Sequence, residues 1–534
     1  MPPFLQFRMW LREGPRGERV ATAVVSLVVL VVAGAALVPV GRGGSAGAEQ
    51  LDAAGGSAPN ASASGPPAQS AAGAGATTGA ATGGTTGAAG AVPGAGGAAR
   101  TAPAGGSSTT GSGSAAGLAP GAPAGQSGGA GATGCGTRTA SAPGITPTQV
   151  HLDMANLSLA GPVGNSTFNV RPDLAKIADA IAADINEHGG VACGRKLVLK
   201  QYDVNPLDSN DSQSKCLQMA ADKPFMVFNL GAYLTPAARQ CLVQAKLLEQ
   251  SATQVDQQEL TASYPYLFTG SAVAEQMVDA TIAGMAKRGF FKGPKFTKLG
   301  LFEDSCSAPV NKEVDAALAR AGVGPSQVSK YVLDCNIASP PNQVEQGVLQ
   351  HKGALASHVL LLSSETNGQN YVRIANGQDF HPQYVVSDYG SNTSGSGTEN
   401  WGAPFDGAVG ITTTRVGEFS SGIHNRQAVA CDSALRAHGV NGVQSESKDT
   451  SALGYCDLFA VVRQALDRAG VNPSQQSFLQ ALSTMGLFRT AVEGDGNFNR
   501  AGKLTGGDFE RQIVYRNSCG CWKVVDRVMA PVTR

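Results

Sequence analysis

The spacing of apolar residues changes at residue 148. From there on, short apolar runs alternate with segments in which apolar side chains recur every three or four positions. The run VHLDMANL at 150–157 predicts a strand, and residues 171–188 predict a helix that ends at the glycine pair 189–190. One face of that helix carries Leu174, Ile177, Ile181 and Ile185. This alternation indicates βαβ units built around a parallel sheet.

The alternation continues in two series. The first predicts further strands at 196–202 and 225–230, with helices at 212–221 and 235–245. The second predicts strands at 298–302, 328–333, 358–362 and 383–386, with helices at 310–321, 342–350 and 370–374. We therefore predict an α/β fold with two doubly wound parallel-sheet lobes. In such sheets ligands bind beyond the carboxyl ends of the strands, so a cleft between the lobes is the expected site.

A long apolar run precedes this region. Residues 20–38 carry no charge and are just long enough to cross a bilayer as a helix, and four arginines come before them. We predict a transmembrane anchor at 20–40 with a basic cytoplasmic N-terminus at 1–19, which makes a single-pass cell-membrane protein with an extracytoplasmic C-terminal domain. The A-x-A pattern at 46–48 leaves a second interpretation open, in which the run is a signal that is cleaved and the protein is secreted.

Composition explains why a chain of 534 residues with 69 Gly has only 15% charged residues. Residues 43–134 are almost wholly Ala, Gly, Ser, Thr and Pro, which offer too little apolar surface to offset chain entropy. We predict a disordered linker here, a tether with an end-to-end distance of about 50 Å. Lys plus Arg equal Asp plus Glu at 40 each, and this balance argues against nucleic acid as a partner.

Ten cysteines support export independently of the apolar run, because an even count in an exported chain indicates disulfides. Sequence alone leaves many pairings open. The pairs we expect are Cys216 with Cys241, Cys306 with Cys335, and Cys431 with Cys456. The two cysteines closest in sequence, in the run CGC at 519–521, have no histidine nearby, so we expect no metal site and no cofactor.

Several segments, taken in order, carry a family resemblance. They are INEHGG at 185–190, CGRKLVLKQYD at 193–203, YPYLFTGSA at 264–272, KLGLFEDS at 298–305 and HPQYVVSDYG at 381–390. Their order and spacing over 145–534 resemble the type I periplasmic substrate-binding proteins, in particular the branched-chain amino acid (Leu/Ile/Val) receptors of ABC transporters. The resemblance implies three chain crossings between lobes, near 270, 389–392 and 508. It therefore implies one ligand-binding lobe from 145–269 plus 391–508 and another from 270–390 plus 509–534.

In the first lobe, two loops at strand ends are candidates for the ligand site. Tyr233 and Thr235 lie where a strand ends and a helix begins, a place that suits a carboxylate, although Thr235 is equally suited to cap the helix. The loop of Ser251, Ala252 and Thr253 resembles the family's small-residue loop that holds an α-amino acid group, and its alternative is an ordinary turn.

In the second lobe, polar residues follow three predicted strands. They are Asp304 and Ser305, Glu365, and Asp388 with Tyr389. By the resemblance, Asp388 pairs with the ligand ammonium, with Glu365 as the other candidate and Tyr389 as an apolar wall; the alternative for Asp388 is a loop carboxylate that accepts backbone hydrogen bonds. Two acids in one cleft would favour a ligand with more positive charge.

The function that these features favour is an extracytoplasmic receptor that captures an amino acid or related solute and delivers it to an ABC permease. The alternative is a sensory or adhesive ectodomain of the same fold without transport. We expect no enzyme, because the sequence has no G-x-S-x-G, no H-E-x-x-H and no Walker A motif.

Overall fold

The computed structural model describes residues 135–158, 171–206, 208–231, 236–252, 254–336, 339–395, 397–499 and 502–532. The predicted N-terminus at 1–19, the membrane segment at 20–40 and the linker at 43–134 lie outside these ranges. Within the described ranges, no helix combines the length and apolar character needed to cross a membrane.

The first sheet has five parallel strands in the order β2-β1-β3-β4-β5. Its strands are β1 (Gln149–Leu157), β2 (Lys196–Val204), β3 (Met226–Leu230), β4 (Leu248–Ser251) and β5 (Leu267–Phe268). The sequence pattern located β1, β2 and β3 within two residues at each end and missed β4 and β5.

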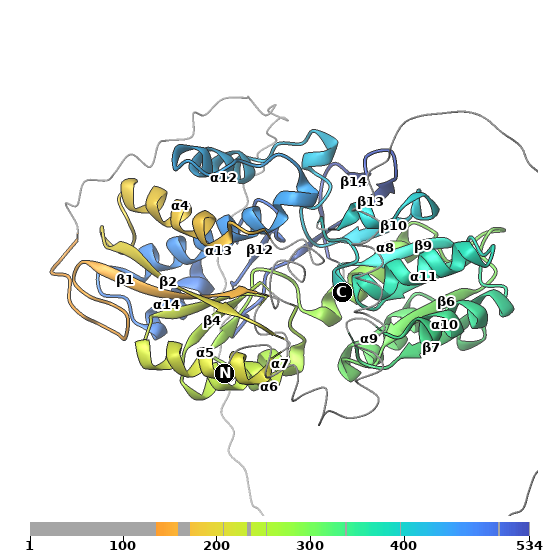
Figure 1. The fold of residues 1–534 in the computed structure, drawn as a ribbon, viewed down its shortest axis with the longest axis horizontal. Helices are drawn as coiled ribbons and strands as arrows, with labels where there is room; N and C mark the ends of the chain where they lie inside the picture. The colour runs from red at the N-terminus through yellow and green to blue at the C-terminus, as the bar shows by residue number, and fades with distance from the viewer. Residues whose placement is uncertain are drawn as a thin grey trace, which may run out of the picture. The chain divides into compact units, whose positions relative to one another are not determined.

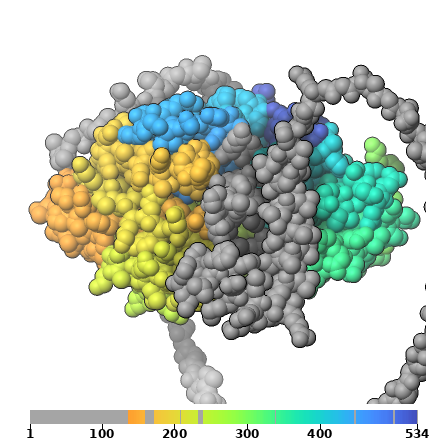
Figure 2. Space-filling view, viewed as in Figure 1, coloured from red at the N-terminus to blue at the C-terminus, as the bar shows by residue number. Residues whose placement is uncertain are grey.

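Helices cover both faces of the first sheet. They are α4 (Leu174–Glu187), α5 (Ser209–Asp222), α6 (Pro236–Gln244), α7 (Gln257–Ala262), α12 (Arg426–Ala437), α13 (Glu446–Ala469) and α14 (Gln475–Thr484). Helices α4, α12 and α13 lie on one side of the sheet and α5 and α6 on the other (Figure 1). Surface residues of α12 lie beside those of α4, although they are distant in sequence (Figure 2).

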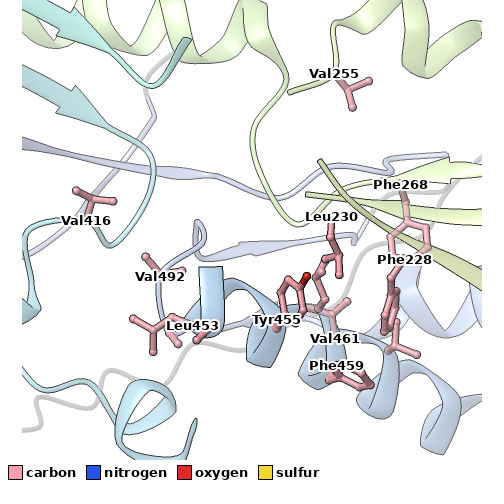
Figure 3. Close-up of a cluster of buried hydrophobic side chains, with 14 of the residues drawn as sticks. Phe228, Leu230, Val255, Phe268, Val416, Leu453, Tyr455, Phe459, Val461 and Val492 are labelled. Carbon is pink, nitrogen blue, oxygen red and sulfur yellow. The ribbon is translucent and has the colours of Figure 1, made fainter. Parts of the chain in front are cut away.

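Aromatic side chains join the first sheet to α13. Phe228 of β3 packs edge-on against Phe459 of α13, with ring centroids 5.0 Å apart. Figure 3 shows Phe228 and Phe268 on the strands, with Phe459 and Val461 on the helix below them. Burying these rings is worth about 1.5–3 kcal/mol for each side chain, so α13 is an integral part of this lobe.

The second sheet repeats the strand order of the first. It comprises β6 (Leu299–Asp304), β7 (Val328–Leu333), β8 (His358–Leu362), β9 (Gln383–Ser387), β10 (Val409–Thr412), β13 (Phe509–Arg516), β14 (Cys521–Val524) and β15 (Ala530–Pro531). The parallel strands have the order β7-β6-β8-β9-β10, and β13 then pairs antiparallel with β10, β14 and β15. A separate hairpin joins β11 (Leu487–Phe488) to β12 (Gly496–Asn497).

Four helices flank the second sheet. They are α8 (Ala274–Lys287), α9 (Ala308–Arg320), α10 (Pro341–Gly353) and α11 (Glu365–Gly377). Helices α8 and α9 pack on each other, as do α10 and α11. The matching strand orders of the two sheets are those of two doubly wound units, as the sequence predicts.

The second chain crossing lies later than we expected. A boundary at residue 391 would assign Val409–Thr412 to the first lobe, but this strand pairs with β9 and β13 in the second sheet. The segment before β10 is also fixed there, because Trp401 stacks on Phe405 at 4.0 Å and Phe405 contacts Trp522 at 5.9 Å. The chain leaves the second sheet only after Thr412.

All ten cysteines form disulfides. The three expected pairs, Cys216–Cys241, Cys306–Cys335 and Cys431–Cys456, are confirmed. Two further bonds join Cys135 to Cys193 and Cys519 to Cys521.

Candidate functional site

A cavity of about 200 Å³ is lined by residues of both lobes. Its walls come from the loops at the carboxyl ends of strands in both sheets, from α8 and α13, and from the crossing segments. The lining residues are Ala252, Gln254, Ser271, Met277, Asp388, Ser391, Thr393, Ser394, Thr414, Val416, Thr450, Val492 and Glu493. Of the residues predicted for the site, this set includes Ala252 and Asp388.

Asp388 follows β9 and is buried. Thr393 donates a side-chain hydrogen bond to its Oδ1, while the Thr413 backbone N–H and hydroxyl donate to Oδ2 at 2.6 and 2.7 Å. The carboxylate therefore lines the cavity and also fixes the loop after β10. Both interpretations of Asp388, ligand partner and acceptor of local hydrogen bonds, are compatible with this position.

Gln254 connects the two lobes directly. Its side-chain amide donates to the backbone carbonyl of Asp388, and its Oε1 accepts from the Gly390 N–H at 3.1 Å. A second link joins two helix caps, since the Ser307 hydroxyl donates to Asp256 Oδ2 at 3.0 Å. In this conformation, hydrogen bonds thus hold the strand ends of the two lobes together beside the cavity.

Ser251 lies just behind the cavity, at the end of β4. Its hydroxyl accepts from Arg239 of α6 at 3.2 Å, and the same guanidinium lies 2.8 Å from Glu249 Oε1 and also bonds Glu259. The Asn229 amide donates to Glu249 at 2.8 Å, and the Ala252 N–H donates to the Asn229 carbonyl at 2.9 Å. A buried charge network therefore positions the predicted Ser251–Ala252 loop.

The other predicted residues of the second lobe lie outside the cavity lining. The Tyr389 ring is buried in the core between the sheet and α8, and its hydroxyl donates to Asp304 at 3.3 Å. We expected Tyr389 to be a wall of the cleft, but the structure places it inside the lobe. Ser305 is exposed, and burial raises the pKa of Asp304.

Glu365 begins α11, directly after β8. Its Oε1 accepts from Gln369 at 2.9 Å. Burial, reinforced by the nearby Glu399 carboxylate, raises the pKa of Glu365 to about 8. The structure does not bring it to the cavity lining, but it places another acid at a strand end of the second sheet.

Tyr233, Thr235 and Thr253 lie outside the described residues. Their part in the site remains a prediction.

Glu493 is a lining residue that the sequence analysis missed. It lies in the loop between β11 and β12, and Ser271 of the first crossing donates a hydrogen bond to its Oε2. Burial, reinforced by Asp388, raises the pKa of Glu493. Asp457 of α13 fixes the segment by accepting the backbone N–H groups of residues 491, 492 and 493 at 2.5, 2.9 and 2.9 Å.

The wall of the cavity carries many groups that can form hydrogen bonds with a ligand. Hydroxyls and two carboxylates are interspersed with the apolar side chains of Met277, Val416 and Val492. In the described part of the chain, no group of three or more His, Cys, Asp or Glu residues is arranged to hold a metal ion.

Comparison with known proteins supports the fold. No protein-family model and no curated protein matches the sequence. Among solved structures, a fatty acid ABC transporter substrate-binding protein from Thermomonospora curvata has 15% identity and a TM-score of 0.53, covering 72% of this chain and 93% of that chain. An ABC transporter solute-binding protein from Rhodopseudomonas palustris BisB5, in complex with 3,4-dihydroxybenzoic acid, has 14% identity and a TM-score of 0.54, covering 72% and 98%.

A leucine-binding protein from Thermotoga maritima MSB8 is similar to the same extent, with 13% identity, a TM-score of 0.53 and coverage of 72% and 99%. At such low identity the likeness concerns the fold. The described region has the fold of the type I periplasmic substrate-binding proteins.

Proposed function

We propose that this protein is an extracytoplasmic solute-binding receptor that captures an amino acid-like small molecule between its two lobes and delivers it to an ABC permease. The observation that carries the proposal is the cavity of about 200 Å³ whose lining comes from both lobes. A solute that contacts both lobes binds the closed arrangement more tightly than the open one. Binding therefore drives closure.

The N-terminal segments and the disulfides also fit this role. The apolar run at 20–38 is suited to anchor the protein, and the linker at 43–134 would let the folded region move above the membrane. The ten paired cysteines suit an oxidising compartment. Solved proteins of this fold are described as binding fatty acid, 3,4-dihydroxybenzoic acid or leucine, so the fold leaves the solute open.

A thermal-shift screen of the full-length protein tests the proposal. Amino acids, amides, polyamines and small carboxylates are the probes, and the proposal predicts that at least one raises Tm in a concentration-dependent way, because a ligand bound only to the folded state stabilises it. No shift with any probe would favour an ectodomain that does not bind solutes.

A further inference from the structure

Both charged side chains among the lining residues of the interlobe cavity are acidic. Asp388 and Glu493 both line it, and none of its lining residues in the described part of the chain is Lys, Arg or His. The adjacent Arg415 is already held by Asp495 at 2.9 Å and by Glu418 at 2.8 Å. The carboxylates of the cavity therefore have no protein cation of the described region facing them across it.

A buried hydrogen-bond acceptor also lies behind the cavity without a donor. Gln250 is 1% exposed, and its Oε1 has no hydrogen-bond donor. It lines a small void of about 10 Å³ that shares Glu493 with the main cavity. Leaving a buried acceptor unpaired costs about 1–3 kcal/mol, so a donor from a ligand or water is favoured here.

The second sheet has an acidic residue at or just after the ends of three strands. Asp304 ends β6, Glu365 begins α11 after β8, and Asp388 follows β9; of the three, Asp388 lines the cavity. Burial raises the pKa of Asp304 and Glu365, as it does for Glu493. A cation bound in the cavity beside Glu493 and Asp388 would relieve the cost of ionising Glu493.

We propose that the solute carries net positive charge, with a cationic nitrogen that donates to Glu493 and Asp388 in the interlobe cavity. This inference rests on the proposed receptor function. The shared chemistry is an ammonium or guanidinium group, which a basic amino acid or a diamine supplies. The cavity is smaller than the 300–1,000 Å³ typical of drug-sized ligands, which suits a small metabolite.

Glu493 is the residue that distinguishes this proposal from simple amino acid binding. Asp388 has three hydrogen bonds from Thr393 and Thr413, whereas Glu493 has one identified side-chain partner, Ser271. Glu493→Gln keeps the shape of the side chain and an oxygen that accepts from Ser271, and it removes only the charge.

Calorimetric titration of the full-length protein tests the inference with five probes: lysine, arginine, putrescine, leucine and 3,4-dihydroxybenzoate. We expect binding of at least one cationic probe, with lysine or arginine favoured if a carboxylate is also recognised and putrescine if it is not. Glu493→Gln should weaken that binding about 10- to 100-fold, the loss expected for one charge-assisted contact. Glu187→Gln, which removes an acid with a side chain 69% exposed in the first lobe, should leave it unchanged.

The pH dependence gives a second readout. The charged groups that face Glu493 are Asp388 from the second lobe and Asp457 from α13. Because the pKa of free Glu493 is raised, affinity for the cation should fall as the pH is lowered, and this dependence should flatten in Glu493→Gln.

The outcomes separate the two proposals. Binding of leucine or 3,4-dihydroxybenzoate with no response to any cation would overturn the charge inference and leave the receptor function standing. Cation binding that Glu493→Gln does not weaken would also overturn it. No binding by any of the five probes, together with no shift in the wider thermal screen, would overturn both.

Discussion

Replacing Arg239 by leucine removes a cation that lies between two buried carboxylates. Arg239 is 0% exposed, and its partners Glu249 and Glu259 are 1% and 8% exposed. Its Nε lies 2.8 Å from Glu249, and its NH1 bonds Glu259. Removing one partner of such a pair costs about 3–5 kcal/mol, because the remaining charge stays buried without compensation. The shift in Tm is this loss divided by the unfolding entropy of the folded region, which is about 2.1 cal/mol/K per residue. We therefore expect Tm to fall by roughly 4 to 6 °C.

The loss should depend on pH. Burial raises the pKa of Glu259 even in the presence of Arg239, and removal of the guanidinium would raise it further. An acid whose folded-state pKa is raised costs stability increasingly as pH rises above its unfolded value of about 4.3. The deficit of Arg239→Leu should therefore be smaller near pH 5 than at pH 8.

Arg320 provides a matched control. It also bridges two carboxylates, with Asp279 at 2.6 Å and Glu313 as its partners, but its side chain is 54% exposed. We expect Arg320→Leu to cost less than about 1 kcal/mol at either pH. Urea unfolding of both variants at pH 5 and pH 8 is the assay. Equal losses for the two variants at pH 8, or a loss for Arg239→Leu that does not shrink at pH 5, would refute the reasoning.

Three further predictions test other parts of the structure. Gln254→Ala removes two hydrogen bonds between the lobes and should open them, seen as a larger radius of gyration in X-ray scattering; an unchanged radius contradicts this. Asp153 is 2% exposed, and burial raises its pKa to about 7. Asp153→Asn removes the cost of ionising this buried carboxyl, so it should stabilise the protein by roughly 1–4 kcal/mol at pH 8 and by less near pH 5. Urea unfolding measures both values. A disulfide stabilises more when it closes a longer loop of the unfolded chain. Breaking the disulfide of Cys135, which spans 58 positions, should therefore cost about 4 kcal/mol, and breaking that of Cys519, which spans 2, below about 2 kcal/mol. Equal losses of stability would contradict this.

The doubly wound fold could be predicted from sequence because each strand and helix buries one continuous apolar set. The predicted strand at 150–157 and the predicted helix at 171–188 show this. The bounds of β1 and α4 differ from these predictions by at most three residues. Strand β10 was missed because VGIT at 409–412 is short and contains a glycine. Its place in the second sheet depends on pairing with β13, about a hundred positions later, and no local pattern reports such a pairing.

The candidate site could be predicted only in part for the same reason. Asp388 was found because it follows a predicted strand, and Ala252 because its loop resembles the family's small-residue loop, although the strand before it was missed. Glu493 does not follow a predicted strand. It reaches the cavity only because the chain returns to this place in three dimensions. The contact of Arg239 with Ser251 likewise joins a helix to a strand end in three dimensions, which neither segment indicates alone.

Hydrogen exchange with and without a bound solute tests the central claim most directly. Once the thermal screen has identified a solute that raises Tm, we expect added protection in peptides from both lobes, around Ala252, Asp388 and Glu493 together. Protection confined to one lobe, or to a surface away from these three residues, would contradict solute capture between the lobes.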